Sequence, residues 1–384
     1  MRIAVLAPGS RGDVEPYVAS GKGLEKAGHV VRLVTHQNFD MLVNSHGLEF
    51  WPVESNVQDI VQSAEMRGLI EKGNFLAVMS QMAKEAERGA IHLSEAGLAA
   101  CRGMDLVLAG IGGLFGGSLN RLSYHLTRQI MWQGFRSADR LARQKVLGLP
   151  AAPFWGPYNT GRMHHYPILY GFSPSVIPPP SDWDSNVHVT GYWFLDPAAD
   201  WTPPLALVEF LQAGSPPVYV GFGSMSNRKP EETADLVLQT LDRTQQRALI
   251  LSGWSGLRKA DLPDSVLMLD SIPFSWLFPR VAAVVHHGGA GTTAAGLRAG
   301  VPAVVIPFFG DQPFWGQRVA ELGVGPAPIP RRKLTVERLA QAIQRAVTDQ
   351  TMRQRAADLG SKIQAEDGIA CAVAVVGQDG SIPR

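Results

Sequence analysis

Short, continuous runs of apolar residues alternate with helical patterns along nearly the whole chain. Runs of this length and composition are typical of strands that are covered on both faces. We predict strands at residues 3–7, 30–35, 106–109, 218–222, 248–251, 266–269, 282–285 and 303–306. The helical patterns between them lie at residues 14–27, 75–98, 231–240, 290–299, 314–322 and 336–347. This alternation predicts an α/β protein with parallel sheets and helices on both sides of each sheet.

The pattern stops and restarts around a proline-rich stretch at residues 196–217. A chain of 384 residues is longer than a single typical core requires. We therefore predict two Rossmann-like domains, residues 1–195 and 218–384, joined by a linker at residues 196–217. Because ligands of such sheets bind beyond the carboxyl ends of the strands, we expect the site in a cleft between the two domains.

Composition excludes several classes of protein. The net charge is +1 and the chain has no basic block, which argues against a nucleic-acid partner. Cys101 and Cys371 are the two cysteines, and they cannot form a disulfide framework. No apolar run is long enough to span a bilayer. The apolar start of the chain breaks at Pro8-Gly9, so we expect a first strand instead of a signal peptide, and a cytoplasmic location.

Residues 285–293, with the sequence VHHGGAGTT, form the most informative motif. A strand that leads into a glycine-rich turn and a helix directs backbone N–H groups at a phosphate. His287 lies at the end of the strand, where glycines permit close approach to a pyrophosphate; the alternative is a strand end with a helix-capping threonine. His286 is expected to point to the other face in a structural role. A metal pair is not expected, because no third ligand has a recognisable spacing.

A second strand is followed by a carboxylate and an amide, Asp311 and Gln312. Both residues lie at the same predicted sheet edge as the glycine-rich turn, and their groups suit the hydroxyls of a sugar. The alternative is an acid that caps the helix starting at Pro313. A phosphate cradle beside a hydroxyl-binding pair predicts a nucleotide-sugar ligand.

These motifs resemble those of the GT-B glycosyltransferases of family 1, the UDP-glycosyltransferases. The similarity is greatest to the branch of sterol glucosyltransferase-like and glycopeptide-aglycone enzymes. The stretches that carry it cover most of the chain and lie at residues 9–16, 120–123, 129–134, 189–193, 221–225, 286–293 and 307–315. The resemblance implies inverting transfer of glucose from UDP-glucose to a hydroxyl of a sterol or other lipophilic aglycone. It also implies no metal and no cofactor, since the UDP-sugar is a co-substrate.

The resemblance assigns donor-binding roles residue by residue. The positions that match those contacting phosphate are His287, Gly289, Gly291, Thr292 and Thr293. The pair that matches the binding site of the transferred sugar is Asp311 and Gln312. With a UDP-sugar and a lipophilic acceptor as partners, we also expect weak association with a membrane surface through the acceptor.

Further donor contacts are expected at other turns. Ser224 matches a hydroxyl that binds the nucleotide phosphate, with a helix N-cap as its alternative. Trp254 and Ile272 follow strands at the same edge and are expected to line the uracil and ribose pocket, although Trp254 could also be packing. The turn after the first strand is expected to meet the pyrophosphate or the developing charge through Ser10, Arg11 and Gly12. Arg11 could equally be an exposed loop residue.

Asp13 matches the residue that serves as general base in the resembling branch. Its alternative is an N-cap, because Pro16 follows where a first helical turn would lie. A helix N-terminus lowers the basicity of a carboxylate, whereas burial beneath an apolar acceptor raises it. We expect the base role, with no histidine partner at this turn.

The chain departs from the family pattern after residues 106–109, where a further helix–strand unit and an acceptor loop would follow. Only residues 110–119 separate that strand from Asn120. The acceptor region is therefore either reduced or covered by a mobile lid, or part of it is missing from this sequence. Asp182 and Asp184 resemble a metal-binding acid pair, but they follow a proline-rich loop and predict a surface turn. Alternative functions are transfer to a polyketide, polyphenol or glycopeptide aglycone, UDP-GlcNAc 2-epimerisation, and inactive nucleotide-sugar binding.

Overall fold

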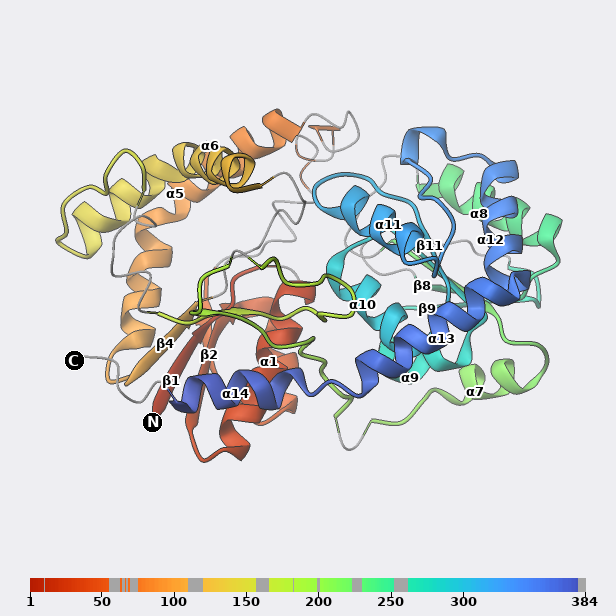
Figure 1. Cartoon of the computed structure of the whole chain (residues 1–384), viewed down its shortest axis with the longest axis horizontal. Helices are drawn as coiled ribbons and strands as arrows, with labels where there is room; N and C mark the ends of the chain where they lie inside the picture. The colour runs from red at the N-terminus through yellow and green to blue at the C-terminus, as the bar shows by residue number, and fades with distance from the viewer. Residues whose placement is uncertain are drawn as a thin grey trace. The chain divides into compact units, whose positions relative to one another are not determined.

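The computed structural model describes residues 1–9, 11–54, 63, 66, 68–69, 75–109, 120–156, 166–181, 183–198, 201–222, 230–251 and 262–378. The chain divides into two compact units, whose elements are labelled in Figure 1. Unit 1 comprises Met1–Gly171, Pro179–Trp193 and Gly368–Arg384. Unit 2 comprises Phe172–Pro178 and Phe194–Asp367.

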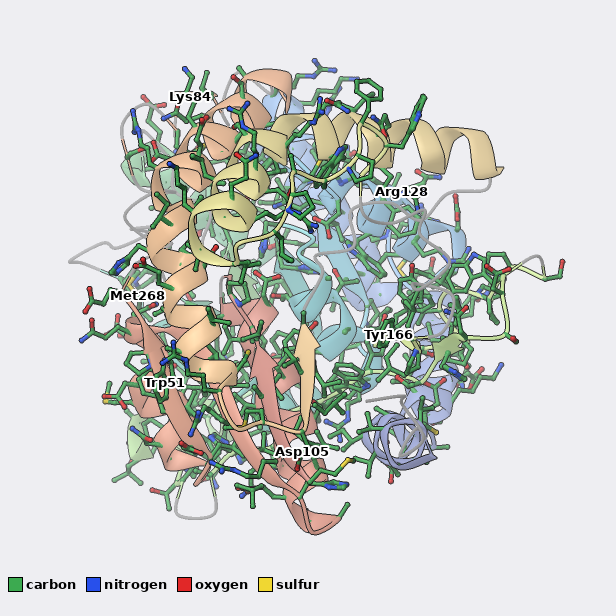
Figure 2. The ribbon with its side chains drawn as sticks, turned by 90° about the vertical axis from the view of Figure 1, so that its left-hand side faces the viewer. Trp51, Lys84, Asp105, Arg128, Tyr166 and Met268 are labelled. Carbon is green, nitrogen blue, oxygen red and sulfur yellow. The ribbon has the colours of Figure 1, made fainter. Side chains whose placement is uncertain are left out.

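The main sheet of unit 1 has four parallel strands in the order β3-β2-β1-β4. Their bounds are β1 Arg2–Leu6, β2 Val30–His36, β3 Glu49–Val53 and β4 Leu106–Ala109. Strand β1 pairs with a strand on each side, and its Ile3, Ala4 and Val5 are fully buried, as expected for a central strand whose two faces are both covered. Figure 2 shows Trp51 on β3 and Asp105 beside β4, at the two edges of this sheet.

The helices of unit 1 pack on this sheet or on one another. Their bounds are α1 Arg11–Lys26, α2 Asp40–Ser45, α5 Phe75–Cys101, α6 Asn120–Leu141 and α14 Gly368–Gln378, with short helical turns at Gln37–Phe39 and Ala142–Val146. Helix α1 buries Val14, Val18 and Leu24, whose spacing places them on one face. Helix α14 lies beside α1 (Figure 1), and a Cβ on Gly23 would overlap the side chain of Ile369. A separate parallel pair is formed by β5 Ile168–Tyr170 and β6 Val187–Val189.

The sheet of unit 2 has five parallel strands in the order β11-β10-β7-β8-β9. Their bounds are β7 Val218–Gly221, β8 Ala248–Leu251, β9 Val266–Leu269, β10 Ala283–His286 and β11 Ala303–Val305. Every residue of β7 and β10 is buried, which explains their continuous apolar sequences. His286 pairs with Val305 in the ladder, so the turns that follow β10 and β11 begin side by side at the carboxyl edge.

The helices of unit 2 cover both faces of its sheet. Their bounds are α7 Leu205–Gln212, α8 Pro230–Thr244, α9 Phe274–Leu277, α10 Ala290–Ala299, α11 Gln312–Glu321, α12 Val336–Thr348 and α13 Gln350–Gln364, with short turns at Phe278–Arg280 and Arg331–Lys333. Side chains cap two of them: Thr335 accepts a hydrogen bond from the Arg338 N–H, and Asp349 accepts one from the Met352 N–H.

The predicted strands and helices are confirmed, with shifts at some of their ends. Strands β3, β5 and β6 were not predicted. Strand β3 contains Pro52, which argues against a strand in a sequence pattern. Strands β5 and β6 are three residues each, too short to show a period.

The structure divides the chain differently from the predicted boundaries. Helix α7 lies inside the predicted linker at 196–217, and its Leu207 is fully buried in a core cluster with Tyr219 and Leu249. Residues Leu205–Gln212 of this stretch are therefore packed structure of unit 2. Residues 368–384 group with unit 1, because α14 packs on α1. Proline content indicated a boundary, but it could not show which unit the flanking helix would pack against.

Candidate functional site

The turn after β10 is built around His286 and Gly288. His286 is fully buried, and its Nδ1 accepts a hydrogen bond from the Gly288 N–H at 3.1 Å. Gly288 has φ +90, and a Cβ there would lie 2.7 Å from a methyl group of Val305. A residue other than glycine would be strained and would overlap its neighbour. His286 therefore stabilises the turn from its buried side through this hydrogen bond, in agreement with the structural role expected for it.

His287 occupies the opposite side of the same turn. Its side chain is 9% exposed, its Nδ1 is buried without a hydrogen-bond partner, and its ring lies so close to Gly289 that a Cβ there would overlap Nε2. Burial lowers the pKa of His287 to about 4. Burial, and then the neighbouring His287, lower the pKa of His286 to about 3. Both rings are therefore neutral at pH 7, and each carries one N–H.

Helix α10 starts immediately after this turn, with Gly289 as its N-cap and no side chain capping it. The N–H and the hydroxyl of Thr293 both donate to the Gly289 carbonyl, each at 2.9 Å. The N–H groups of residues 290–292 precede the first helical hydrogen bond, so the helix gives them no acceptor. Such a helix start attracts an anion.

Thr293 differs from the other predicted phosphate contacts. It is 1% exposed, and both of its donors are used inside the helix. The structure therefore does not support Thr293 as a donor-binding residue. Gly291 is exposed and Thr292 is half-buried at the first turn of α10, where the N–H groups begin.

The turn after β11 positions Asp311 and Gln312. The Gln312 side chain is 5% exposed, and its Oε1 accepts the N–H groups of Phe308 at 2.8 Å and Phe309 at 3.2 Å. Asp311 is the N-cap residue of α11, and its Oδ2 accepts the indole N–H of Trp315 at 2.9 Å. A Cβ on Gly288 would lie 3.0 Å from the Gln312 carbonyl oxygen, so the two turns touch. The structure thus brings the predicted phosphate and sugar groups together.

Three other donor contacts were predicted in unit 2, at Ile272, Ser224 and Trp254. Ile272 is 5% exposed and packs in the core cluster with Leu277 and Phe278, so its side chain is not available to a nucleotide and only its backbone could be. Ser224 and Trp254 lie outside the described residues.

Asp13 is the third residue of α1, so it is not the N-cap. It is exposed, and a Cβ on Gly9 would lie 2.6 Å from its Oδ2. Gly9 has φ +148, a conformation that favours glycine. Position 9 therefore requires glycine for two reasons. Its backbone has a positive φ, and a Cβ there would occupy the space of the Asp13 carboxylate.

An aromatic pair lies beside Asp13. Burial, and then the charge of Asp13, raise the pKa of Tyr17. The Tyr17 ring makes an edge contact with Trp193 at 5.8 Å between ring centroids, and the Trp193 indole N–H donates to the Thr190 hydroxyl at 2.9 Å. Tyr17 was not predicted to have a role, although its position four residues after Asp13 on a helix indicates that the two side chains share a face.

The other donor contacts predicted at the turn after β1 are Ser10, Arg11 and Gly12. Arg11 forms an ion pair with Glu15 at 2.7 Å, and the Arg11 side chain is 53% exposed. Gly12 is exposed, and Ser10 lies outside the described residues. A phosphate contact by Arg11 stays a prediction, and it would compete with the ion pair.

The described part of the chain contains neither a cluster of metal ligands nor a membrane-spanning helix. Within it, no three His, Cys, Asp or Glu side chains gather as a metal site would require. No helix in the described ranges is long and apolar enough to cross a membrane. Asp182 and residues 110–119, where the acceptor region departs from the family pattern, lie outside those ranges.

Two family models match the chain. The glycosyltransferase family 28 N-terminal domain matches residues 3–104, which contain Asp13. The C-terminal domain of the erythromycin biosynthesis protein CIII-like family matches residues 237–374, which contain the turns after β10 and β11.

A sterol 3-beta-glucosyltransferase of Arabidopsis thaliana is 36% identical over 420 aligned positions, covering 97% of this chain and 67% of the relative. The chain spans only 27–30% of several fungal sterol 3-beta-glucosyltransferases. Because 420 aligned positions exceed the 384 residues of the chain, the plant relative carries at least 36 residues that this chain lacks.

Solved glycosyltransferases share the fold. The calicheamicin glycosyltransferase CalG4 superimposes with a TM-score of 0.70 at 20% identity, covering 100% of both chains. The Streptomyces sp. SF2575 glycosyltransferase SsfS6, solved with thymidine diphosphate, gives a TM-score of 0.67 at 20% identity and covers 98% of this chain and 99% of that one. Two Rossmann-like units are characteristic of the GT-B fold, and together with the identity to the plant enzyme they establish that the chain belongs to the sterol 3-beta-glucosyltransferase family of GT-B glycosyltransferases.

Proposed function

We propose that the protein transfers glucose from UDP-glucose to a hydroxyl of a sterol or another lipophilic aglycone, with inversion at the anomeric carbon. The observation that carries this proposal is the 36% identity to a plant sterol 3-beta-glucosyltransferase across 97% of the chain. The two family models support glycosyl transfer in both halves of the chain.

The turns of unit 2 support the donor half of the proposal. His287 and the N–H groups at the start of α10 would bind the diphosphate, and Asp311 would accept hydrogen bonds from the hydroxyls of the sugar. The hydrogen bond from the Trp315 indole N–H orients the Asp311 carboxylate, and it already occupies one of the two carboxylate oxygens, Oδ2. The groups proposed to bind the diphosphate are the neutral His287 ring, backbone N–H groups and the dipole of α10, which stabilise a diphosphate without a metal ion. We therefore expect turnover to survive EDTA.

Asp13 supports the chemical half. In the proposed reaction the acceptor hydroxyl oxygen forms a bond to the anomeric carbon, and the bond from that carbon to UDP breaks. The hydroxyl proton passes to the Asp13 carboxylate, and UDP leaves with the electron pair. The Asp13 carboxylate is exposed and lies beside Gly9, so an acceptor hydroxyl could reach it, as a general base requires.

The test is a product screen by mass spectrometry. The purified chain is incubated with UDP-glucose, other UDP-sugars and dTDP-glucose, each with a sterol, a polyphenol and a polyketide aglycone, with and without EDTA. A glucosylated sterol formed from UDP-glucose in EDTA supports the proposal. No sterol product with any donor, while another acceptor is glycosylated, refutes the acceptor. Loss of turnover in EDTA that Mg²⁺ restores refutes the metal-free donor site.

A second candidate is transfer from a dTDP-sugar to a natural-product aglycone. It is favoured by the full-length superposition on the calicheamicin enzyme and by the thymidine diphosphate bound to SsfS6. The two candidates separate in the same screen, because UDP and dTDP differ in the base and the 2′-hydroxyl. A preference for dTDP-glucose together with a polyketide acceptor would establish the second candidate.

A further inference from the structure

The ring of Tyr17 lies near the carboxylate proposed as the general base. Tyr17 follows Asp13 by four residues in α1, so the two side chains share one face of the helix. Burial, and then the charge of Asp13, raise the pKa of the Tyr17 phenol. The other charged side chains of this turn, Arg11 and Glu15, pair with each other at 2.7 Å. Asp13 therefore has a half-buried aromatic ring as its neighbour one turn further along α1.

Trp193 supports the Tyr17 ring. The two rings make an edge contact, with 5.8 Å between their centroids and an angle of 74° between their planes. The Trp193 indole N–H donates to the Thr190 hydroxyl at 2.9 Å, and that hydroxyl lies 3.2 Å from the Tyr170 carbonyl, which can accept from it. The Thr190 N–H donates to the same carbonyl at 3.0 Å. Hydrogen bonds thus join the support of Tyr17 to the end of strand β5.

Gly171 leaves room for the Trp193 indole. A Cβ on Gly171 would lie only 3.3 Å from the indole atom Cδ2, so the backbone packs closely on this ring. The indole is therefore held both by its N–H and by the backbone against it. The residues that support Tyr17 all belong to unit 1, as does Asp13.

An exposed aspartate needs such a support if it is to act as a base. Asp13 is exposed, and an exposed side chain can populate more than one staggered rotamer. A general base must lie within hydrogen-bond distance of the hydroxyl that it deprotonates, and a displacement of about 1 Å can lower the rate about 100-fold. Gly9 leaves the space that the carboxylate occupies, and a supported ring one turn away limits the directions in which that carboxylate can turn.

We propose that Tyr17 is a positioning residue, whose ring, supported by Trp193, keeps the Asp13 carboxylate turned toward the acceptor hydroxyl. The ring carries this role, since the contact with Trp193 is made by the ring. The inference deepens the proposed function and rests on it for Asp13 as the base.

Steady-state kinetics with UDP-glucose and cholesterol dispersed in detergent test this role. Tyr17→Leu removes the ring and should lower kcat by about 10–100-fold, the effect of a misplaced catalytic group. KM for UDP-glucose should stay within about twofold, because the ring acts on the base and not on the donor. Tyr17→Phe keeps the ring and should retain at least about a third of kcat, whereas Trp193→Leu, which removes the support, should lower kcat about 3–10-fold.

Trp51→Leu is the matched control. It removes a half-buried aromatic ring from β3, at an edge of the unit 1 sheet (Figure 2), and kcat should stay within about twofold of that of the unaltered chain. Thermal unfolding of each variant shows whether a loss of rate reflects a loss of fold. Equal values of kcat in Tyr17→Leu and Trp51→Leu would overturn the role of Tyr17.

The Asp13→Asn background distinguishes positioning from packing. A residue that acts through the carboxylate has nothing to position once the carboxylate is gone, so Tyr17→Leu should change the residual rate of Asp13→Asn by less than about twofold. A further loss as large as the one in the unaltered chain would overturn the proposal. Normal turnover by Asp13→Asn would refute the base and, with it, this role of Tyr17.

A titration tests the contact without turnover. The ultraviolet absorbance of the phenolate, taken as the difference between the unaltered chain and Tyr17→Phe, follows Tyr17 alone. Asp13→Asn should lower the pKa of Tyr17, whereas Glu15→Gln should leave it nearly unchanged. An equal pKa in Asp13→Asn and the unaltered chain would show that the carboxylate does not lie beside Tyr17. If cholesterol gives no product, the proposed acceptor is refuted, and the same losses are expected with the polyphenol or polyketide that the product screen identifies.

Discussion

Replacing His287 by alanine tests the donor site most directly. The ring is 9% exposed, its Nδ1 is enclosed without a partner, and its Nε2 lies against Gly289 at the start of α10. With a pKa of about 4 the ring carries one proton at pH 7. Leaving a lone pair unpaired at the enclosed Nδ1 costs less than leaving an N–H unpaired there, so we place the proton on Nε2.

The expected loss follows from this single donor. A hydrogen bond to a charged group contributes about 1.5–3 kcal/mol, so His287→Ala should weaken UDP binding by roughly 10–150-fold. His287→Gln carries an amide N–H at a similar reach and should recover part of the affinity. The loss should be seen in UDP affinity with or without the sugar, because the proposed contact is with the diphosphate.

Thr293→Val is the matched control. It removes a hydroxyl six residues after His287 in the same motif, but that hydroxyl donates to the Gly289 carbonyl in the first turn of α10. Its UDP affinity should stay within about twofold of that of the unaltered chain, since the lost bond is internal to the helix. Isothermal calorimetry with UDP measures all three variants. Unchanged affinity in His287→Ala, or an equal loss in Thr293→Val, would refute the assignment of the site.

Three further predictions concern the turn after β1 and the buried histidines. Asp13→Asn should lower the catalytic rate by about 10²–10⁴ and leave UDP affinity unchanged; normal turnover would show that Asp13 is not the base. Gly9→Ala should lower the rate without lowering UDP affinity, because its Cβ would displace the Asp13 carboxylate; steady-state kinetics with and without saturating donor measures this, and an unchanged rate would contradict it. His286 and His287 have pKa values of about 3 and 4 when folded, below about 6.5 when unfolded, so the unfolded chain binds more protons between these values. The free energy of unfolding should therefore fall as pH falls from about 6.5 to 4, by up to about 1.4 kcal/mol per pH unit for each histidine. The fall in the free energy of unfolding between pH 7 and pH 5, measured with urea, should be smaller in His286→Asn than in the unaltered chain. An equal fall in the two proteins would refute the role of His286.

The sequence alone determined most strands of the two main sheets and the placement of several candidate site residues after their ends. Strands such as Val218–Gly221 and Ala283–His286 are continuous apolar runs, because helices cover both of their faces. Helix α10 begins and ends where the sequence predicts, since glycine punctuates both of its ends. The positions of His287, Asp311 and Asp13 just after strands could also be predicted, because parallel strands place such residues at one edge of a sheet.

Other elements carried no such signal. Strand β3 contains Pro52, and α7 lies in a stretch whose prolines indicate a linker. Their structure depends on partners distant in sequence: β3 pairs with β2, and Leu207 of α7 fills a space beside Tyr219. Local propensity therefore gave the wrong answer where tertiary packing was stronger.

Only the tertiary structure decided where individual polar groups point. Thr292 and Thr293 are neighbours of the same type, yet the Thr293 side chain is buried and donates a hydrogen bond to the Gly289 carbonyl, whereas Thr292, one position earlier, is half-buried. The contact between Gly288 and the Gln312 carbonyl and the three hydrogen bonds that side chains of α6 donate to the Phe154 carbonyl likewise join segments that no sequence period connects. A periodic pattern reports which face of an element is apolar, but a hydrogen bond depends on which donor and acceptor the packing brings within about 3 Å of each other.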